Sequence, residues 1–115
     1  MKLSPYQITP QLVQEIRRFA PFGEGNREPV FLMEDMIVEQ ARMVGNGSKH
    51  LKLSLRPGDG SGLKAFDAIG FNLGTKFPEL LPGQRVDIVF ELEENTWNGN
   101  TSTQLKLIDM RLNQK

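Results

Sequence analysis

"KHLKLSLR", residues 49–56, shows the clearest alternation of apolar and polar side chains in the chain. The apolar positions are Leu51, Leu53 and Leu55. The polar positions between them are His50, Lys52, Ser54 and Arg56. Because successive side chains of a strand point to opposite faces, this pattern predicts a strand with one face in a core and the other in water.

Further strand-like runs, separated by turn residues, lie on both sides of this strand. The run at residues 30–44 is too long for one straight strand, so we expect it to be bent or bulged. Later strands are expected at residues 63–71, 85–94 and 102–112. In residues 85–94 the side chains expected to point inward are Val86, Ile88, Phe90 and Leu92, and those expected outward are Asp87, Glu91 and Glu93.

Two helical segments are expected. At residues 10–20, Thr9 is suited to the N-cap and Pro10 to the first helical position. One apolar face of this helix would hold Leu12, Val13, Ile16 and Phe19. A second, short helix is expected around residues 76–81, where Pro78 interrupts the pattern.

Three strands, a short helix and two more strands form the element order of an OB-fold. We therefore predict an all-β protein, a five-stranded OB-fold Greek-key barrel with an N-terminal helix and a short helix between strands three and four. An SH3-like barrel is the alternative that periodicity leaves open. In this interpretation residues 1–29 are the helix and a junction, and residues 30–115 are the barrel.

Composition restricts the partners. The 115 residues include 14 basic and 14 acidic side chains, so a site for a polyanion must be a local feature. Neither a membrane-spanning run nor a signal-peptide core is present in the sequence, and we expect a soluble, cytoplasmic protein that does not bind membranes. The absence of cysteine excludes disulfides and thiol nucleophiles.

The same composition disfavours catalysis by this chain alone. His50 is the single histidine, and the sequence contains no GxSxG, HExxH or phosphate-loop motif. Carboxylates such as Asp35 and Asp109 are scattered rather than clustered. We therefore expect no catalytic residue, no metal site and no cofactor in this chain.

In an OB-fold, ligands usually bind the outer face of strands two and three. The polar side chains expected there are Arg42, Lys49, His50, Lys52, Arg56 and Lys64, and the aromatic ones are Phe66 and Trp97. Asp59 is the one acid between residues 42 and 64, whereas Glu91, Glu93 and Glu94 gather near the end of strand four. Cations along phosphates and aromatics on bases would hold a nucleic-acid strand without reading its sequence.

Each of these residues also has a structural interpretation. Lysine and arginine on the wet face of a strand commonly serve solubility alone. Phe66 could face the barrel interior, and Trp97 could cover one end of the barrel. His50 could be an ordinary surface residue. The helix dipole explains Arg17 and Arg18 without a phosphate contact.

Two longer motifs resemble a known family. PFGEGNREPVF, residues 21–31, is similar to the PFGxGNPxPxF signature that opens the C-terminal OB domain of RecJ-type single-strand-specific DNA exonucleases. ELEENTWNGNTSTQLKLIDMR, residues 91–111, resembles the NxWNG hairpin and last strand of that domain. HLKLSL and FDAIGFNLG fit its strands two and three, and Arg27 departs from the signature, which often has proline there.

The resemblance implies that the chain binds single-stranded DNA for a larger enzyme. Members of this family degrade single-stranded DNA from the 5′ end in repair and recombination, with divalent Mn or Mg held by Asp and His residues of preceding domains. Those catalytic motifs are missing from this sequence, so the resemblance implies a fragment whose partners are DNA and the upstream catalytic domains. The chain would grip the strand and leave cleavage to those domains.

Two further expectations follow from the resemblance. Gly23, Gly25 and Asn26 would form a structural junction where a helix from the nuclease body turns into the barrel, rather than a phosphate site. The alternative function is a protein-interaction module that docks the nuclease onto a single-strand-binding protein or a helicase. Exposed Ile108 and Met110 on the last strand would supply that interface.

Overall fold

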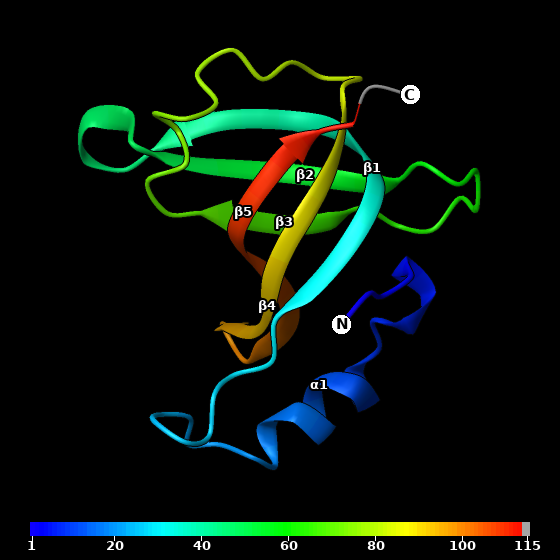
Figure 1. The fold of residues 1–115 in the computed structure, drawn as a ribbon, viewed down its shortest axis with the longest axis vertical. Helices are drawn as coiled ribbons and strands as arrows, with labels where there is room; N and C mark the ends of the chain where they lie inside the picture. The colour runs from blue at the N-terminus through cyan, green and yellow to red at the C-terminus, as the bar shows by residue number, and fades with distance from the viewer. Residues whose placement is uncertain (114–115) are drawn as a thin grey trace.

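Five strands close into a barrel in the computed structural model, which describes residues 1–113 apart from the side chains of Ser48 and Trp97 (Figure 1). The strands are β1 (Phe31–Val44), β2 (His50–Pro57), β3 (Phe66–Gly70), β4 (Arg85–Trp97) and β5 (Asn100–Leu112). Helix α1 (Pro10–Arg17) precedes them, and short 3-10 turns lie at Pro5–Gln7 and Asn46–Ser48.

The barrel has the strand order β1-β2-β3-β5-β4, with β4 returning to β1. β3 and β5 pair in parallel, while the other neighbouring strands are antiparallel. This is the topology of the OB-fold, so the predicted fold class is confirmed.

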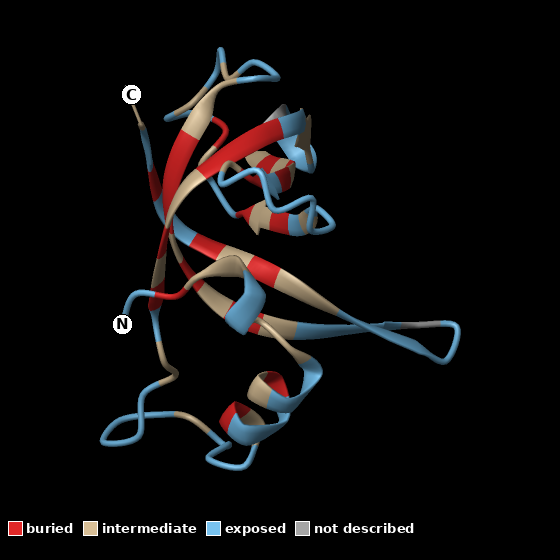
Figure 2. Cartoon of the chain, turned by 90° about the vertical axis from the view of Figure 1, so that its right-hand side faces the viewer, coloured by how far each residue is buried: buried red, intermediate tan, exposed pale blue. Residues whose placement is uncertain are grey.

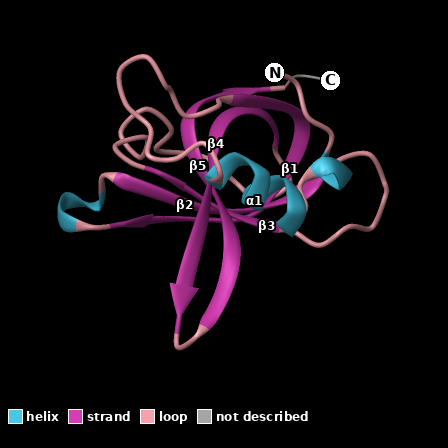
Figure 3. Ribbon diagram, turned by 90° about the horizontal axis from the view of Figure 1, so that it is seen from below, coloured by secondary structure: helices cyan, strands magenta, loops and turns pink. Residues whose placement is uncertain are grey.

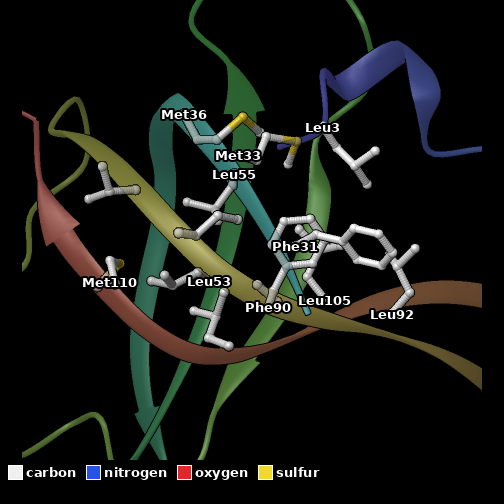
Figure 4. Packing of buried hydrophobic residues seen from close by; sticks show 14 of the residues in the cluster. Leu3, Phe31, Met33, Met36, Leu53, Leu55, Phe90, Leu92, Leu105 and Met110 are labelled. Carbon is white, nitrogen blue, oxygen red and sulfur yellow. The ribbon is translucent and has the colours of Figure 1, made fainter. Parts of the chain in front are cut away.

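The core contains the inward side chains of all five strands, joined by Leu3, Val13 and Ile16 from the N-terminal segment (Figures 2 and 4). Leu51, Leu53 and Leu55 of β2 are each at most 2% exposed, as their alternation predicts. The rings of Phe31 and Phe90 pack against each other with their centroids 5.9 Å apart. A continuous apolar interior therefore holds the barrel closed, because burying this surface is the main source of stability.

Strand β1 is bent, as its length predicts. Its first half pairs with β4 and its second half with β2. The register shifts between Met33 and Met36 and again between Val38 and Gln40. Such bulges turn a strand around a barrel corner, and they let one strand serve both neighbours.

The prediction of a short helix between β3 and β4 is wrong, because residues 71–84 form a series of turns and no helix. Amides of Leu73, Lys76 and Phe77 make single-turn hydrogen bonds, and the pattern stops before Pro78, which has no amide hydrogen to donate. The strands also differ in length from their prediction. β3 begins at Phe66, and the β4–β5 hairpin continues to a two-residue turn at Asn98 and Gly99 (Figure 3).

Helix α1 begins as predicted but ends early. Oγ1 of Thr9 accepts a hydrogen bond from the amide of Leu12 (3.1 Å), and Val13 and Ile16 are buried against the barrel. The prediction that Phe19 shares this buried face is wrong, since Phe19 is 67% exposed. The helix ends at Arg17, so its 3.6-residue period no longer governs where the Phe19 side chain points.

The prediction that Asp87 faces water is also wrong, because its side chain is 4% exposed. Its carboxylate accepts hydrogen bonds from the amide of Asp35 (2.9 Å), Nε of Arg111 (2.8 Å) and Nδ2 of Asn113 (2.8 Å). Burial by itself raises the pKa of Asp87, but these hydrogen bonds outweigh it, so the pKa lies below its ordinary value of 3.8. The bulge in β1 is thereby tied to the end of β5.

The lowered pKa of Asp87 predicts a pH-dependent contribution to stability. Its stabilisation is complete above the unfolded-state pKa, near 4, and is lost as the pH falls through the lower folded-state pKa. We expect Asp87→Asn to cost about 1 to 2 kcal/mol at neutral pH, and this difference from wild type to shrink below about pH 4. Urea unfolding of both proteins at several pH values measures it, and a constant difference would contradict it.

Candidate nucleic-acid interface

An open groove of about 550 Å³ crosses the outer face of β1, β2 and β3. Its polar lining consists of Glu39, Gln40, Arg42, Lys52, Ser54 and Asp67, and Pro82 borders it. Pro82 lies there because the amide of Gly83 donates to the carbonyl of Val38 in β1 (2.7 Å). The groove therefore occupies the wet face that the alternation in β2 predicts.

Strand register brings the central side chains of the groove together. Arg42 of β1 lies opposite Lys52 of β2, so two cations neighbour each other on the outer face. Ser54 lies opposite Asp67 of β3. Directly opposed side chains of antiparallel strands have Cβ atoms about 5 Å apart. Two like charges this close repel each other, and an anion placed between them would relieve that repulsion.

The other predicted cations lie outside the groove. Lys49 follows the 3-10 turn at one end of β2, Arg56 lies near the other end, and Lys64 is in the loop after β2. All three are exposed. The structure thus brings Arg42 and Lys52 together and places Lys49, Arg56 and Lys64 at increasing distance along the chain from this pair.

The cations predicted to bind DNA differ from most other cations in whether they form ion pairs. Among residues 1–113, the basic side chains that form ion pairs are Lys2, Arg17, Arg18, Lys76, Arg85, Lys106 and Arg111. The five predicted binding cations, Arg42, Lys49, Lys52, Arg56 and Lys64, form none within that range. Arg27 is the remaining described cation without an ion pair. These five cations are therefore not held in ion pairs within the described residues and could contact an external anion.

The expectation that the acids gather elsewhere is only partly correct. Glu91 of β4 does lie beside Lys106, with Nζ 3.8 Å from its carboxylate, and burial raises the pKa of Glu91. Glu39 and Asp67, however, line the groove itself. Barrel closure places them there, and inspection of residues 42–64 alone could not show it.

His50 is more than a surface residue, because its side chain holds two segments of the chain together. Its Nδ1 accepts a hydrogen bond from the amide of Asn72 (3.0 Å), and its ring meets that of Phe71 edge-on with centroids 5.2 Å apart. Gly45 leaves room for the imidazole, since a Cβ there would lie 2.5 Å from Cδ2 of His50. His50 thus links the β1–β2 turn to the segment that follows β3.

The aromatic predictions have different outcomes. Phe66 lies opposite the inward-facing Leu55 and packs against the core, as the structural interpretation holds. The side chain of Trp97 is outside the described residues. Phe71, which the sequence reasoning missed, is 52% exposed. No local sequence pattern marked it, because it lies directly after β3, where Gly70 is paired with the inward-facing Leu51.

The junction is a compact turn attached to the barrel. The amide and carbonyl of Gly23 bond the carbonyl and amide of Asn26 (2.8 and 3.0 Å), and Nδ2 of Asn26 donates to the carbonyls of Phe19 and Pro21. Gly25 has φ of 82°, a conformation that favours glycine. Because the amides of Gly23 and Asn26 are used within the turn, they are not free to bind phosphate.

Arg17 fastens this region to the barrel. Its Nη2 donates to the carboxylate of Glu28 and to the carbonyl of Leu92 in β4 (2.8 Å). Nearer the N-terminus, Leu3 is buried and its amide donates to the carbonyl of Leu32 (2.8 Å). Residues 1–29 therefore share the barrel's core and hydrogen bonds. Arg17 serves these contacts rather than only the helix dipole.

Residues 1–113 contain no group of three His, Asp or Glu side chains that could hold a metal ion. Over the same range no helix is long and apolar enough to cross a membrane. The closed barrel has the topology of an OB-fold, and a partly cationic groove lies open over its first three strands. The chain is therefore an OB-fold domain whose groove lies on the face where such domains usually bind ligands.

Residues 1–109 match the family described as the RecJ OB domain, and the chain belongs to this family. It is 33% identical over 107 residues to the single-stranded-DNA-specific exonuclease RecJ of Bacillus subtilis, covering 93% of this chain and 13% of that protein. The protein of the same name from Haemophilus influenzae is 33% identical, over 94% of this chain and 18% of the relative. The chain thus spans less than a fifth of these relatives.

Solved structures agree with the family. RecJ from Thermus thermophilus in complex with Mg²⁺ superposes with a TM-score of 0.66 and 31% identity, over 92% of this chain and 15% of that one. A mitochondrial single-stranded DNA binding protein from S. cerevisiae superposes with a TM-score of 0.56 and 14% identity, over 74% of this chain and 92% of that one. The second likeness shows the fold alone.

Proposed function

We propose that this chain is the single-stranded-DNA-binding OB domain of a RecJ-type exonuclease that acts from the 5′ end in DNA repair and recombination. It grips the strand, and cleavage takes place in other domains of the same protein. The observation that carries the proposal is that Arg42 and Lys52, which line the groove, and Lys49, Arg56 and Lys64, which lie outside it, form no ion pair within residues 1–113. Its relatives' names, which specify single-stranded DNA, support it.

The cations along this face would bind successive phosphates of a DNA backbone. Lys52 and Arg56 lie four residues apart on the same strand, which is about 13 Å along β2. A nucleic-acid backbone lying over β2 would pass both cations, with Arg42 beside the first of them. Such contacts neutralise phosphates irrespective of base, so they slow dissociation without selecting a sequence.

Catalysis in this proposal belongs to a separate part of the enzyme. RecJ of Thermus thermophilus has been solved in complex with Mg²⁺ and with Mn²⁺. The side chains of residues 1–113 do not fit such a metal, since they form no cluster of potential ligands. We therefore assign metal chemistry to domains outside this chain and derive no step of it here.

The alternative, docking onto a single-strand-binding protein or a helicase, has less support. Ile108 is 46% exposed, but Met110, the second residue expected at that interface, is 4% exposed and belongs to the core. Leu112 is the other exposed apolar side chain of β5 (44%), and two such side chains are a small patch for a stable interface. Arg42 and Lys52 of the groove, which form no ion pair among the described residues, favour DNA over this alternative.

Salt dependence of binding tests the proposal. Fluorescence anisotropy of labelled oligo-dT should show weak binding of this chain, with a slope of log K against log salt near about −3 if about four phosphates are neutralised. That slope corresponds to roughly a 60-fold loss of affinity between about 50 and 200 mM salt.

Two outcomes would contradict the proposal. No detectable binding at low salt, or binding that does not change with salt, would show that these cations do not bind DNA phosphates. Metal-dependent nuclease activity of the purified chain would contradict the assignment of cleavage to other domains.

A further inference from the structure

We propose that Phe71 is a base-stacking platform at one end of the groove and that His50 is the residue that positions it. This inference rests on the proposed function, because it names one contact within the same DNA-binding face. It differs from the sequence-based expectation, which assigned stacking to Phe66 and Trp97.

Phe71 directly follows β3, whose register with β2 ends where Gly70 lies opposite Leu51. Outward-facing Ser54 lies opposite Asp67, and outward-facing Lys52 lies opposite Ile69. Continued by one row, this register would set His50 opposite Phe71 on the outward side, and the contact between their rings, with centroids 5.2 Å apart, agrees with that placement. Phe71 is therefore one side-chain row beyond Lys52, about 7 Å along the strand.

The Phe71 ring is both accessible and held in place. It is 52% exposed, unlike Phe66, which packs on the core. The two rings meet at 75°, so the contact is edge-on and His50 does not lie flat on the Phe71 ring. A rigid aromatic surface loses little conformational entropy on contact, which favours stacking.

His50 is itself held by its surroundings. The Asn72 amide donates to its Nδ1, and the absence of a side chain at Gly45 makes room for its ring. Asn72 has φ of 63°, so the chain turns sharply directly after Phe71. These contacts fix the position of Phe71 from both sides, and His50 acts on DNA only through that position.

Cations on either side of this pair complete a site for one nucleotide. Lys49 precedes His50 in the chain, and Lys52 lies one row further along β2. Both are free of ion pairs within residues 1–113. An aromatic face flanked by free cations matches a base with its adjoining phosphates, and every base offers a π-face, so the site tolerates any sequence.

The test compares oligo-dT with an oligomer of the same length made of abasic nucleotides, both measured by anisotropy at low salt. We expect Phe71→Leu to weaken binding of oligo-dT by about fivefold or more and to leave the abasic oligomer within about twofold. Phe71→Tyr should retain wild-type binding. Phe19→Leu, at a residue that is 67% exposed beyond the end of α1, is the matched control and should change neither affinity.

His50→Ala tests the positioning role with the same two oligomers. We expect a smaller loss for oligo-dT, about threefold, and no loss for the abasic oligomer. A purely structural defect would lower both affinities alike, so this difference separates positioning from local unfolding.

The possible failures are distinguishable. Wild-type binding of oligo-dT together with an unchanged affinity in Phe71→Leu would overturn this inference and leave the proposed function intact. An equal loss for both oligomers would also overturn it. Failure of the wild-type protein to bind either oligomer would overturn both.

Discussion

The double variant Arg42→Glu/Lys52→Glu is expected to bind oligo-dT about a hundredfold more weakly than wild type at about 50 mM salt. These two cations lie opposite each other in the groove, and neither has an ion pair in the described chain, so both can contact phosphate although Glu39 and Asp67 line the same groove. Reversal replaces two attractions by two repulsions. The salt slope should also become shallower by about 1.4, because about two phosphate contacts are lost. Anisotropy titrations at several salt concentrations measure both changes.

A double variant with the same change in net charge provides the control. Arg18 and Arg27 are exposed and lie in α1's C-terminal turn and in the junction, away from the β1–β2 hairpin (Figure 1). We expect Arg18→Glu/Arg27→Glu to lose less than about threefold, since long-range repulsion is screened over about 10 Å. Equal losses in both variants would mean that total charge, and not the groove, determines binding.

Phe90→Ala should destabilise the barrel by about 3 to 5 kcal/mol. The Phe90 side chain is fully buried, lies at the centre of the core and packs against Phe31 (Figure 4). Its removal loses both the transfer energy of the ring and the contacts of the atoms around the cavity that it leaves. A small domain has a total stability of only about 5 to 15 kcal/mol. Urea unfolding measures the loss as a lowered midpoint.

Phe19→Ala makes the same chemical change at an exposed site. Because Phe19 is 67% exposed, we expect its loss to stay within about 0.5 kcal/mol. A similar cost for both variants would contradict the burial that the structure assigns, and would instead support the helical periodicity that places Phe19 in the core.

Local patterns predicted most of the barrel. The alternation in β2 and β4 identified the buried side chains, since a strand with one wet face must alternate. The length of β1 predicted its bend. The patterns failed where local rules stop applying: at Phe19, beyond the end of α1, and at residues 76–81, where a single turn does not continue past Pro78.

The candidate site was predicted less completely. Arg42 and Lys52 were expected on the ligand face and lie in the groove together. Phe71, Glu39 and Asp67 were missed, because each reaches this face through the pairing of strands or the bending of β1 rather than through its own neighbours in sequence.

The sequence by itself determined the alternation of apolar side chains, and this alternation identified the strands and the core. The sequence also determined the family to which the chain belongs. Only the tertiary structure decided which polar residues share a face, which cations remain unpaired, and that Asp87 is buried rather than wet. The physical reason is how far apart in the sequence the interacting residues lie. Alternation is a property of neighbouring residues, whereas opposition across strands and ion pairing depend on register, which is set by bulges and barrel closure.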